Sequence, residues 1–376
     1  MVNILIPYAK QSIDEDDIEA VCNVLRSDWI TTGPKVKEFE KAVADFIGVK
    51  YAVAFNSGTS ALHSAMFALN IGYGDEVILS PITFAATANC IILQGATPVF
   101  ADVDPDTLLI EPRKVEEKIN KNTKAIIAVD YAGQPCKYDQ LIEIKNKYNI
   151  SLVADSCHAL GARYKGKKIG SIADMTIFSF HPVKHITTGE GGMIVSDKKE
   201  IIKQARLFRN HGINIDFEER EKKNTWYYDI QNVGCNYRIN DIQCALGISQ
   251  LKKLPSFLKR RSSIAQIYNT AFKNIDKIKP LKVRSEIVHA YHLYVIRLIN
   301  LDRSKIFSYL RKQGIGVNVH YIPLHLHSYF KKRFNYDYGL CMCAEDAYET
   351  LITLPMFPRL TDKDVNYIIQ VLLECV

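Results

Sequence analysis

Short apolar runs alternate with helix-like stretches between residues 51 and 196. The runs are YAVAF, EVILS, TPVFADV, KAIIAVD, SLVAD, TIFSF and GMIVS, and patterns such as TSALHSAMFAL and ATANCIILQG separate them. Runs this short that are rich in Val and Ile are typical of strands buried on both faces of a sheet. The alternation therefore predicts an α/β fold with a mostly parallel sheet.

The segments on either side of this region have different patterns. Acidic first turns or apolar residues at helical spacing predict helices at 14–25 and 35–46, which would form an N-terminal arm. After about residue 250 we expect a helix through 259–272, a strand at 292–299, a helix at 303–314 ended by Gly314, a strand at 317–321 and a closing helix from Asp362. This mixture predicts a smaller α+β domain, so the expected domains are 1–250 and 251–376.

The composition is that of an ordinary globular protein, with 47% apolar and 24% charged residues among 376. The chain starts without a signal-peptide pattern and has no apolar run of about 20 residues, so we expect a cytoplasmic protein that does not enter a membrane. A net charge of +7 with dispersed lysines shows no stripe for nucleic acid. Nine scattered cysteines suit a reducing compartment.

Two groups of residues could suggest a metal ion. Cys341 and Cys343 are closer together than the usual zinc pair and have no second pair. His320, His325 and His327 lie in one segment, but no acid or cysteine nearby completes a ligand set. We expect loop or surface histidines there and no metal.

A group of small polar residues follows the run YAVAF. Asn56, Ser57, Gly58, Thr59 and Ser60 come directly before a predicted helix. Hydroxyls and free backbone N–H groups at a helix N-terminus can hold a phosphate. Ordinary helix capping is the alternative, because no G-x-G-x-x-G or G-x-x-x-x-G-K-[ST] pattern is present.

Asp155 ends the apolar run SLVAD. Ligands of open α/β sheets gather outside the carboxyl ends of the strands, so this carboxylate is well placed to meet a cofactor. It could keep a pyridine nitrogen protonated, which makes the ring an electron sink. Capping of a following helix is the ordinary alternative.

Lys184 lies in SFHPVKH, after the run TIFSF and before the glycine-rich TTGEGG. A lysine in such a loop can project its amine into the cleft at the strand ends. Nearby cations and desolvation would lower the pKa of the amine there. A solvated surface lysine is the alternative.

Together, NSGTSAL, the 155–159 segment DSCHA, SFHPVKHITTGEGG and the 234–243 segment GCNYRINDIQ resemble the nucleotide-sugar aminotransferases of the type I pyridoxal-phosphate (PLP) fold, the aspartate aminotransferase fold. The resemblance extends over nearly the whole chain, from residue 11 to residue 325. Within the family it is strongest to the enzymes of pseudaminic acid biosynthesis. These aminate C4 of a UDP-linked 4-keto-6-deoxy-N-acetyl-L-sugar with L-glutamate as donor.

The resemblance implies a role for each matching position. Lys184 would be the catalytic lysine that binds PLP as a Schiff base, and the cofactor would also be bound by Gly58, Thr59, Phe84, Asp155, His158, Ser179 and Asn236. Asn236 would reach the phosphate of a neighbouring subunit, so a homodimer with shared sites is implied. The sugar nucleotide would contact Tyr8, Trp29, Thr31, Ser57, His320 and Tyr321.

Two alternatives remain open. The substrate could be another nucleotide keto sugar, linked to GDP or dTDP. The chain could also be a sensor with this fold that binds cofactor or nucleotide sugar without turnover, because a fold alone does not prove activity. The intact set of Lys184, Asp155 and Ser179 favours an enzyme. Relatives with dehydratase activity have histidine in place of the lysine, which this chain retains.

Overall fold

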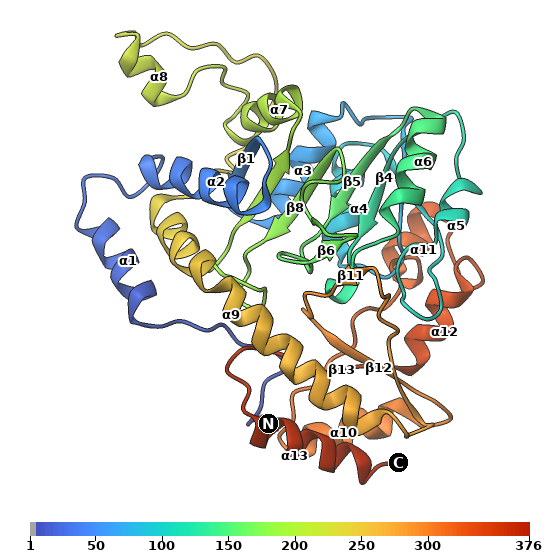
Figure 1. The fold of residues 1–376 in the computed structure, drawn as a ribbon. Coiled ribbons are helices and arrows are strands. Elements are labelled where there is room, and N and C mark those ends of the chain that lie inside the picture. The colour runs from blue at the N-terminus through green and yellow to red at the C-terminus, as the bar shows by residue number, and fades with distance from the viewer. Residues whose placement is uncertain (1–4) are drawn as a thin grey trace.

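A seven-stranded sheet forms the centre of the computed structural model, which describes residues 5–376 apart from the side chain of Glu218 (Figure 1). Its strand order is β1-β9-β8-β5-β4-β2-β3. The strands are β1 (Tyr51–Phe55), β2 (Glu76–Leu79), β3 (Thr97–Phe100), β4 (Thr123–Val129), β5 (Ser151–Asp155), β8 (Met175–Ser179) and β9 (Gly192–Ser196). All seven predicted strands are confirmed. β9 runs antiparallel to both of its neighbours, and the other neighbouring pairs are parallel.

Helices cover this sheet and extend from it. They are α1 (Glu15–Leu25), α2 (Pro34–Ile47), α3 (Gly58–Ala68), α4 (Ala85–Leu93), α5 (Pro112–Glu116), α6 (Tyr138–Tyr148), α7 (Lys199–Arg209) and α8 (Phe217–Lys222). The two predicted N-terminal helices are confirmed as α1 and α2, which both pack on α9 (Asp241–Phe272). No described helix has the length and apolar character needed to cross a membrane.

The C-terminal part contains a second, three-stranded sheet in the order β10-β12-β13. These strands are β10 (Ile278–Pro280), β12 (Tyr294–Leu298) and β13 (Leu351–Leu354), and the helices are α10 (Arg303–Lys312), α11 (Ser328–Phe334), α12 (Met342–Thr350) and α13 (Asp362–Leu373). A third small sheet joins β11 (Ile287–Val288), β6 (Arg163–Tyr164) and β7 (Lys167–Lys168). Short 3-10 turns occupy Tyr131–Gly133 and Leu324–Leu326.

Two hydrophobic cores lie on the two sheets, and α9 contributes to both. Cys244 and Leu254 belong to the larger core, while Ile264 and Phe272 belong to the smaller one. Residues 324–351 also supply side chains to the larger core. The expected boundary between residues 250 and 251 falls inside α9, so the division into two domains stays a prediction.

The predicted strand at 317–321 is wrong. Only Asn318 pairs there, in an isolated bridge with Thr353. The Asn318 side chain accepts the Val319 N–H at 2.8 Å, and the His320 carbonyl accepts the Tyr131 hydroxyl. These side-chain hydrogen bonds replace the ladder that the apolar pattern predicted.

Candidate active site

Two neighbouring parallel strands, β5 and β8, end in the polar residues Asp155 and Ser179. The Asp155 side chain is 5% exposed and accepts hydrogen bonds from the Thr87 hydroxyl at 2.7 Å and the Cys157 N–H at 3.3 Å. It forms no ion pair with any residue in the range 5–376. A buried carboxylate that has hydrogen bonds but no ion-pair partner is suited to a positively charged ligand atom.

Lys184 lies in the turn after β8, where its N–H donates to the His181 carbonyl at 2.9 Å. Its amine makes no hydrogen bond or ion pair with another described residue. Burial lowers the pKa of Lys184. Electrostatic interactions with Cys157 and Asp155 partly oppose this effect, and the positive charge of Arg261 adds to it. The direction expected from the sequence is therefore confirmed, and a larger fraction of the amine is neutral near pH 7.

Aromatic and imidazole side chains form a connected group whose histidines feel the charge of this amine. The His158 Nε2 lies 3.3 Å from the Tyr321 hydroxyl oxygen, and the Phe84 and Tyr321 rings are 6.3 Å apart. The Tyr8 and His320 rings are 5.5 Å apart. Burial, and then the charge of Lys184, holds the pKa of His158 well below its usual value.

His320 is also neutral, because burial and then Lys184 lower its pKa to about 4. Its Nδ1 lies 2.9 Å from the Thr353 hydroxyl. His325, expected in a loop or at the surface, is fully buried with its Nε2 2.8 Å from Glu345. In the described part of the chain, no group of three or more His, Cys, Asp or Glu side chains could hold a metal.

Two further buried residues near Lys184 were not predicted from the sequence. The His292 ring lies 4.2 Å from the His158 ring and 5.6 Å from the His185 ring. Arg261 is 1% exposed and donates to the carbonyls of Tyr291, His292 and Met356 at 3.0–3.2 Å. In sequence, His292 opens an apolar run and Arg261 lies in a lysine-rich helix, so neither carries a local signal of this position.

The N-terminus of α3 lies beside Ser179. Ser57 caps the helix by accepting the Ser60 N–H, so the capping interpretation is correct for Ser57. The N–H groups of Gly58 and Thr59 have no acceptor among the described residues. A Cβ on Gly58 would lie 3.0 Å from the Ser179 Cβ, so the absence of a side chain there brings the hydroxyl close to these donors.

The remaining predicted site residues are Asn236, Trp29 and Thr31. Asn236 is exposed, and its carbonyl accepts a long hydrogen bond of 3.4 Å from Asn56, which follows β1. Trp29 is 46% exposed, and Thr31 forms a backbone bridge with Asn240 at the start of α9. Within residues 5–376 neither Trp29 nor Thr31 makes a ring contact or hydrogen bond with the group around Lys184.

These residues fit pyridoxal phosphate on observations of this chain. The cofactor needs a primary amine for its aldehyde, an anion for its ring nitrogen and donors for its phosphate. Lys184 offers an unpaired amine, Asp155 a buried carboxylate without a counterion, and α3 a helix N-terminus with free N–H groups. The buried Nδ1 of His158 also lacks a partner among the described residues.

Comparisons with known proteins agree with this fit. A family model described as the DegT/DnrJ/EryC1/StrS aminotransferase family matches residues 11–373. A UDP-4-amino-4,6-dideoxy-N-acetyl-beta-L-altrosamine transaminase from Campylobacter jejuni is 40% identical over 97% of this chain and 96% of its own length. The spore coat polysaccharide biosynthesis protein SpsC from Bacillus subtilis is 40% identical over 100% of this chain and 98% of its own. PseC from Helicobacter pylori, an aminotransferase involved in the biosynthesis of pseudoaminic acid, superimposes with a TM-score of 0.92 at 36% identity, over 98% of both chains.

Proposed function

Because the chain belongs to the DegT/DnrJ/EryC1/StrS aminotransferase family, we propose that it transfers an amino group from L-glutamate to C4 of a UDP-linked 4-keto-6-deoxy-N-acetyl-L-sugar. The chain is a PLP-dependent sugar aminotransferase with the type I PLP fold. The donor, the nucleotide and the keto position belong to the proposal. The relatives named for a UDP-sugar transamination and for pseudoaminic acid biosynthesis support the nucleotide and the position on the sugar. The glutamate donor rests on the family resemblance alone.

The observation that carries the proposal is the unpaired amine of Lys184 beside the buried carboxylate of Asp155. When bound, PLP supplies an electron sink for the carbon that loses or gains a proton. In our proposal Asp155 keeps a proton on the cofactor's pyridine nitrogen. Lys184, as a neutral amine, removes the proton from the donor's α-carbon and later returns one to C4 of the sugar.

Other side chains would bind and orient the cofactor and the sugar nucleotide. Ser179, Thr59 and the Gly58 N–H would hold the phosphate, His158 would face the phenolic oxygen, and Phe84 would stack on the ring. Because burial raises the pKa of Tyr321 well above its usual value, its hydroxyl keeps its proton and can donate to an oxygen of the sugar. The remaining sugar-nucleotide contacts would come from Tyr8, Trp29, Thr31, Ser57 and His320. The homodimer, with Asn236 reaching the second site, and the cytoplasmic location are further parts of the proposal.

A different nucleotide keto sugar is the second candidate. SpsC is as similar to this chain as the altrosamine transaminase, and its name places it in spore coat polysaccharide biosynthesis. The two candidates share Lys184 and differ only in the acceptor. A sensor without turnover has less support, because binding alone does not require an unpaired amine with a lowered pKa.

The test follows the visible absorbance of the PLP-loaded protein in two steps. L-glutamate alone should bleach the band of bound PLP, and the UDP-linked 4-keto sugar should then restore it. Lys184→Ala should do neither, whereas Lys167→Ala, at an exposed lysine of β7, should match the wild type. If glutamate bleaches the band and only a GDP- or dTDP-linked keto sugar restores it, the acceptor assignment is wrong. A band that no amino acid bleaches would leave the sensor as the better account.

A further inference from the structure

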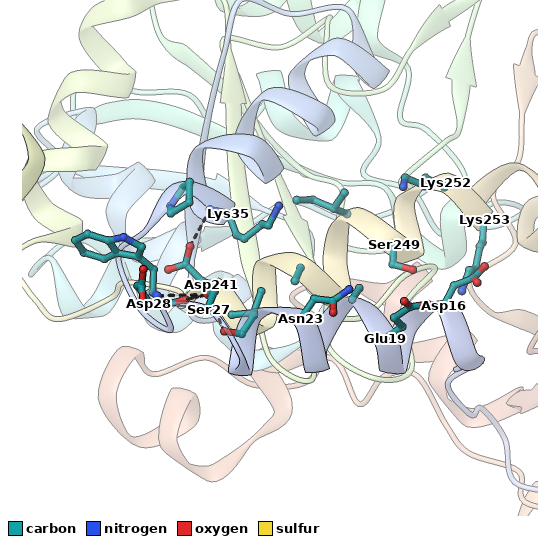
Figure 2. Close-up of a pocket in the computed structure, with 16 residues that line it drawn as sticks. Asp16, Glu19, Asn23, Ser27, Asp28, Lys35, Asp241, Ser249, Lys252 and Lys253 are labelled. Atoms are coloured by element: carbon teal, nitrogen blue, oxygen red, sulfur yellow. Dashed lines mark hydrogen bonds between the residues drawn. The ribbon is translucent and has the colours of Figure 1, made fainter.

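Asp241 is a fully buried carboxylate that joins two distant segments of the chain. Its two oxygens accept the N–H of Gly33 at 2.6 Å and the N–H of Lys35 at 2.8 Å, across 208 and 206 residues. Figure 2 shows Asp241 beside Lys35. No described cation pairs with it. The two donors belong to the start of α2, while Asp241 itself is in the first turn of α9.

The start of α2 needs this partner. Its N-cap residue is Gly33, which has no side chain and makes no capping hydrogen bond of its own. The first N–H groups of a helix have no partner within the helix. Asp241 therefore acts as the cap of α2 from another helix, and its negative charge lies at the positive ends of both α2 and α9.

The same contacts fix the loop of residues 29–33. The Asp241 N–H donates to the Ile30 carbonyl at 3.2 Å, and Thr31 bridges the neighbouring Asn240. A Cβ on Gly33 would lie 2.7 Å from the Trp29 Cβ and 2.9 Å from the Asp241 Oδ1. The loop, the glycine and the carboxylate are therefore fitted closely to one another.

The other side of the loop borders a pocket. A pocket of about 680 Å³ lies between α1, this loop and α9, and its lining includes Asp28, Trp29 and Asp241 (Figure 2). The Trp29 side chain is 46% exposed. The Trp29 ring lies 6.2 Å from the Phe217 ring, and Trp29 is hydrogen-bonded locally to Ser27. The hydrogen bonds that join the loop to distant described residues go to the start of α9.

We infer that Asp241 is a positioning residue for the acceptor sugar: it holds the loop that carries Trp29 and Thr31 and takes no part in the donor half of the reaction. The inference rests on the proposed function, which assigns Trp29 and Thr31 to the sugar nucleotide. The donor half requires Lys184 and Asp155, which stand at or just after the strand ends of the large sheet. Within the described residues neither makes a hydrogen bond or ion pair with this loop. A displaced loop should therefore weaken acceptor binding alone.

The experiment measures the two half-reactions separately with the PLP-loaded protein and Asp241→Asn. The amide turns an N–H toward one of the two backbone donors, so one hydrogen bond is lost and two donors face each other. We expect the KM for the keto sugar to rise about tenfold, which corresponds to one hydrogen bond to a charged group, with the rate of bleaching by glutamate changed less than about twofold. Gly33→Ala, which disturbs the same fit from the loop side, should give the same split.

A matched control separates positioning from general stability. Asp102 also caps a distant helix, accepting the N–H groups of Cys343 and Ala344 at the start of α12 at 2.9 and 3.1 Å. Asp102→Asn should lower the melting temperature while both half-reactions stay near wild-type values. The inference is overturned if Asp241→Asn slows both half-reactions equally, if a folded variant keeps the wild-type KM, or if Asp102→Asn raises that KM as much. If the wild type itself reacts with glutamate but with no keto sugar, the proposed acceptor is wrong. That outcome is seen in the wild type alone and is therefore distinct from a failure of the Asp241 inference.

Discussion

Replacing Gly192 by alanine should weaken PLP binding through a collision with the start of α3. The added Cβ would lie 2.3 Å from the Ser57 carbonyl oxygen and 2.7 Å from the Gly58 nitrogen. Ordinary contacts are about 3.5 Å, so these backbone atoms must move by about 1 Å. Overpacking of this kind costs about 1–3 kcal/mol of stability, and one lost hydrogen bond to a phosphate costs about 1.5–3 kcal/mol of binding. The dissociation constant for PLP should rise about 10- to 100-fold.

The assay titrates cofactor-free protein with PLP and follows the absorbance of the bound form. Gly58→Ala should have a smaller effect, because its Cβ would meet the Ser179 side chain at 3.0 Å, where a small shift relieves the contact. Gly72→Ala is the control, since its nearest neighbour would be the Gln94 carbonyl at 4.0 Å. If Gly192→Ala folds and binds PLP as tightly as Gly72→Ala, the N-terminus of α3 is not the phosphate site.

Arg261→Met removes a buried cation that lowers the pKa of Lys184, so the acidic limb of the pH–rate profile of the glutamate half-reaction should move to higher pH. Arg261→Lys retains the cation and should retain the wild-type profile. Identical pH–rate profiles for the two variants, measured by stopped flow, would contradict this. Burial raises the pKa of Asp130 to about 6, so the folded state holds a proton that the unfolded state has lost, and stability falls as pH rises from about 4 to 6. The melting temperature of Asp130→Asn should therefore rise relative to that of the wild type as the pH increases from about 4 to 6. A difference in melting temperature that stays constant over this range would contradict the raised pKa. Glu40→Gln breaks a buried pair with Arg209 (2.7 Å) and should cost about 3–5 kcal/mol in urea unfolding, whereas a loss below about 1 kcal/mol would mean that the pair contributes little.

The strands of the large sheet could be predicted because each is a short apolar run bounded by turns. The segment 317–321 has the same apolar character but does not form a strand, since the Asn318 side chain and the Tyr131 hydroxyl take up backbone groups that a ladder would use. Periodicity describes the burial of side chains. It does not show which partner satisfies the backbone.

The candidate site likewise contains some residues that the sequence could predict and others that it could not. Lys184 and Asp155 could be predicted because the end of a buried strand is a local feature that fixes where a side chain points. His292 and Arg261 could not, because their contacts cross long sequence distances: 105 residues separate His185 from the Ala290 carbonyl near His292. Asp241 and Gly33 are 208 residues apart, and neither has a local pattern that requires the other.

One helix connects the contacts that the sequence did not reveal. At its start, α9 holds the loop of residues 29–33 through Asp241, and further along it holds the carbonyls of Tyr291, His292 and Met356 through Arg261. Figure 1 shows α9 running from beside α2 to the smaller sheet. α9 is one continuous helix of 32 residues, with Pro255 inside it, and it therefore connects these segments directly. The strand ends set the position of the reacting amine, whereas the start of α9 sets the loop proposed to contact the acceptor. Substitution of Lys184 should therefore affect both half-reactions, and substitution of Asp241 the acceptor half alone.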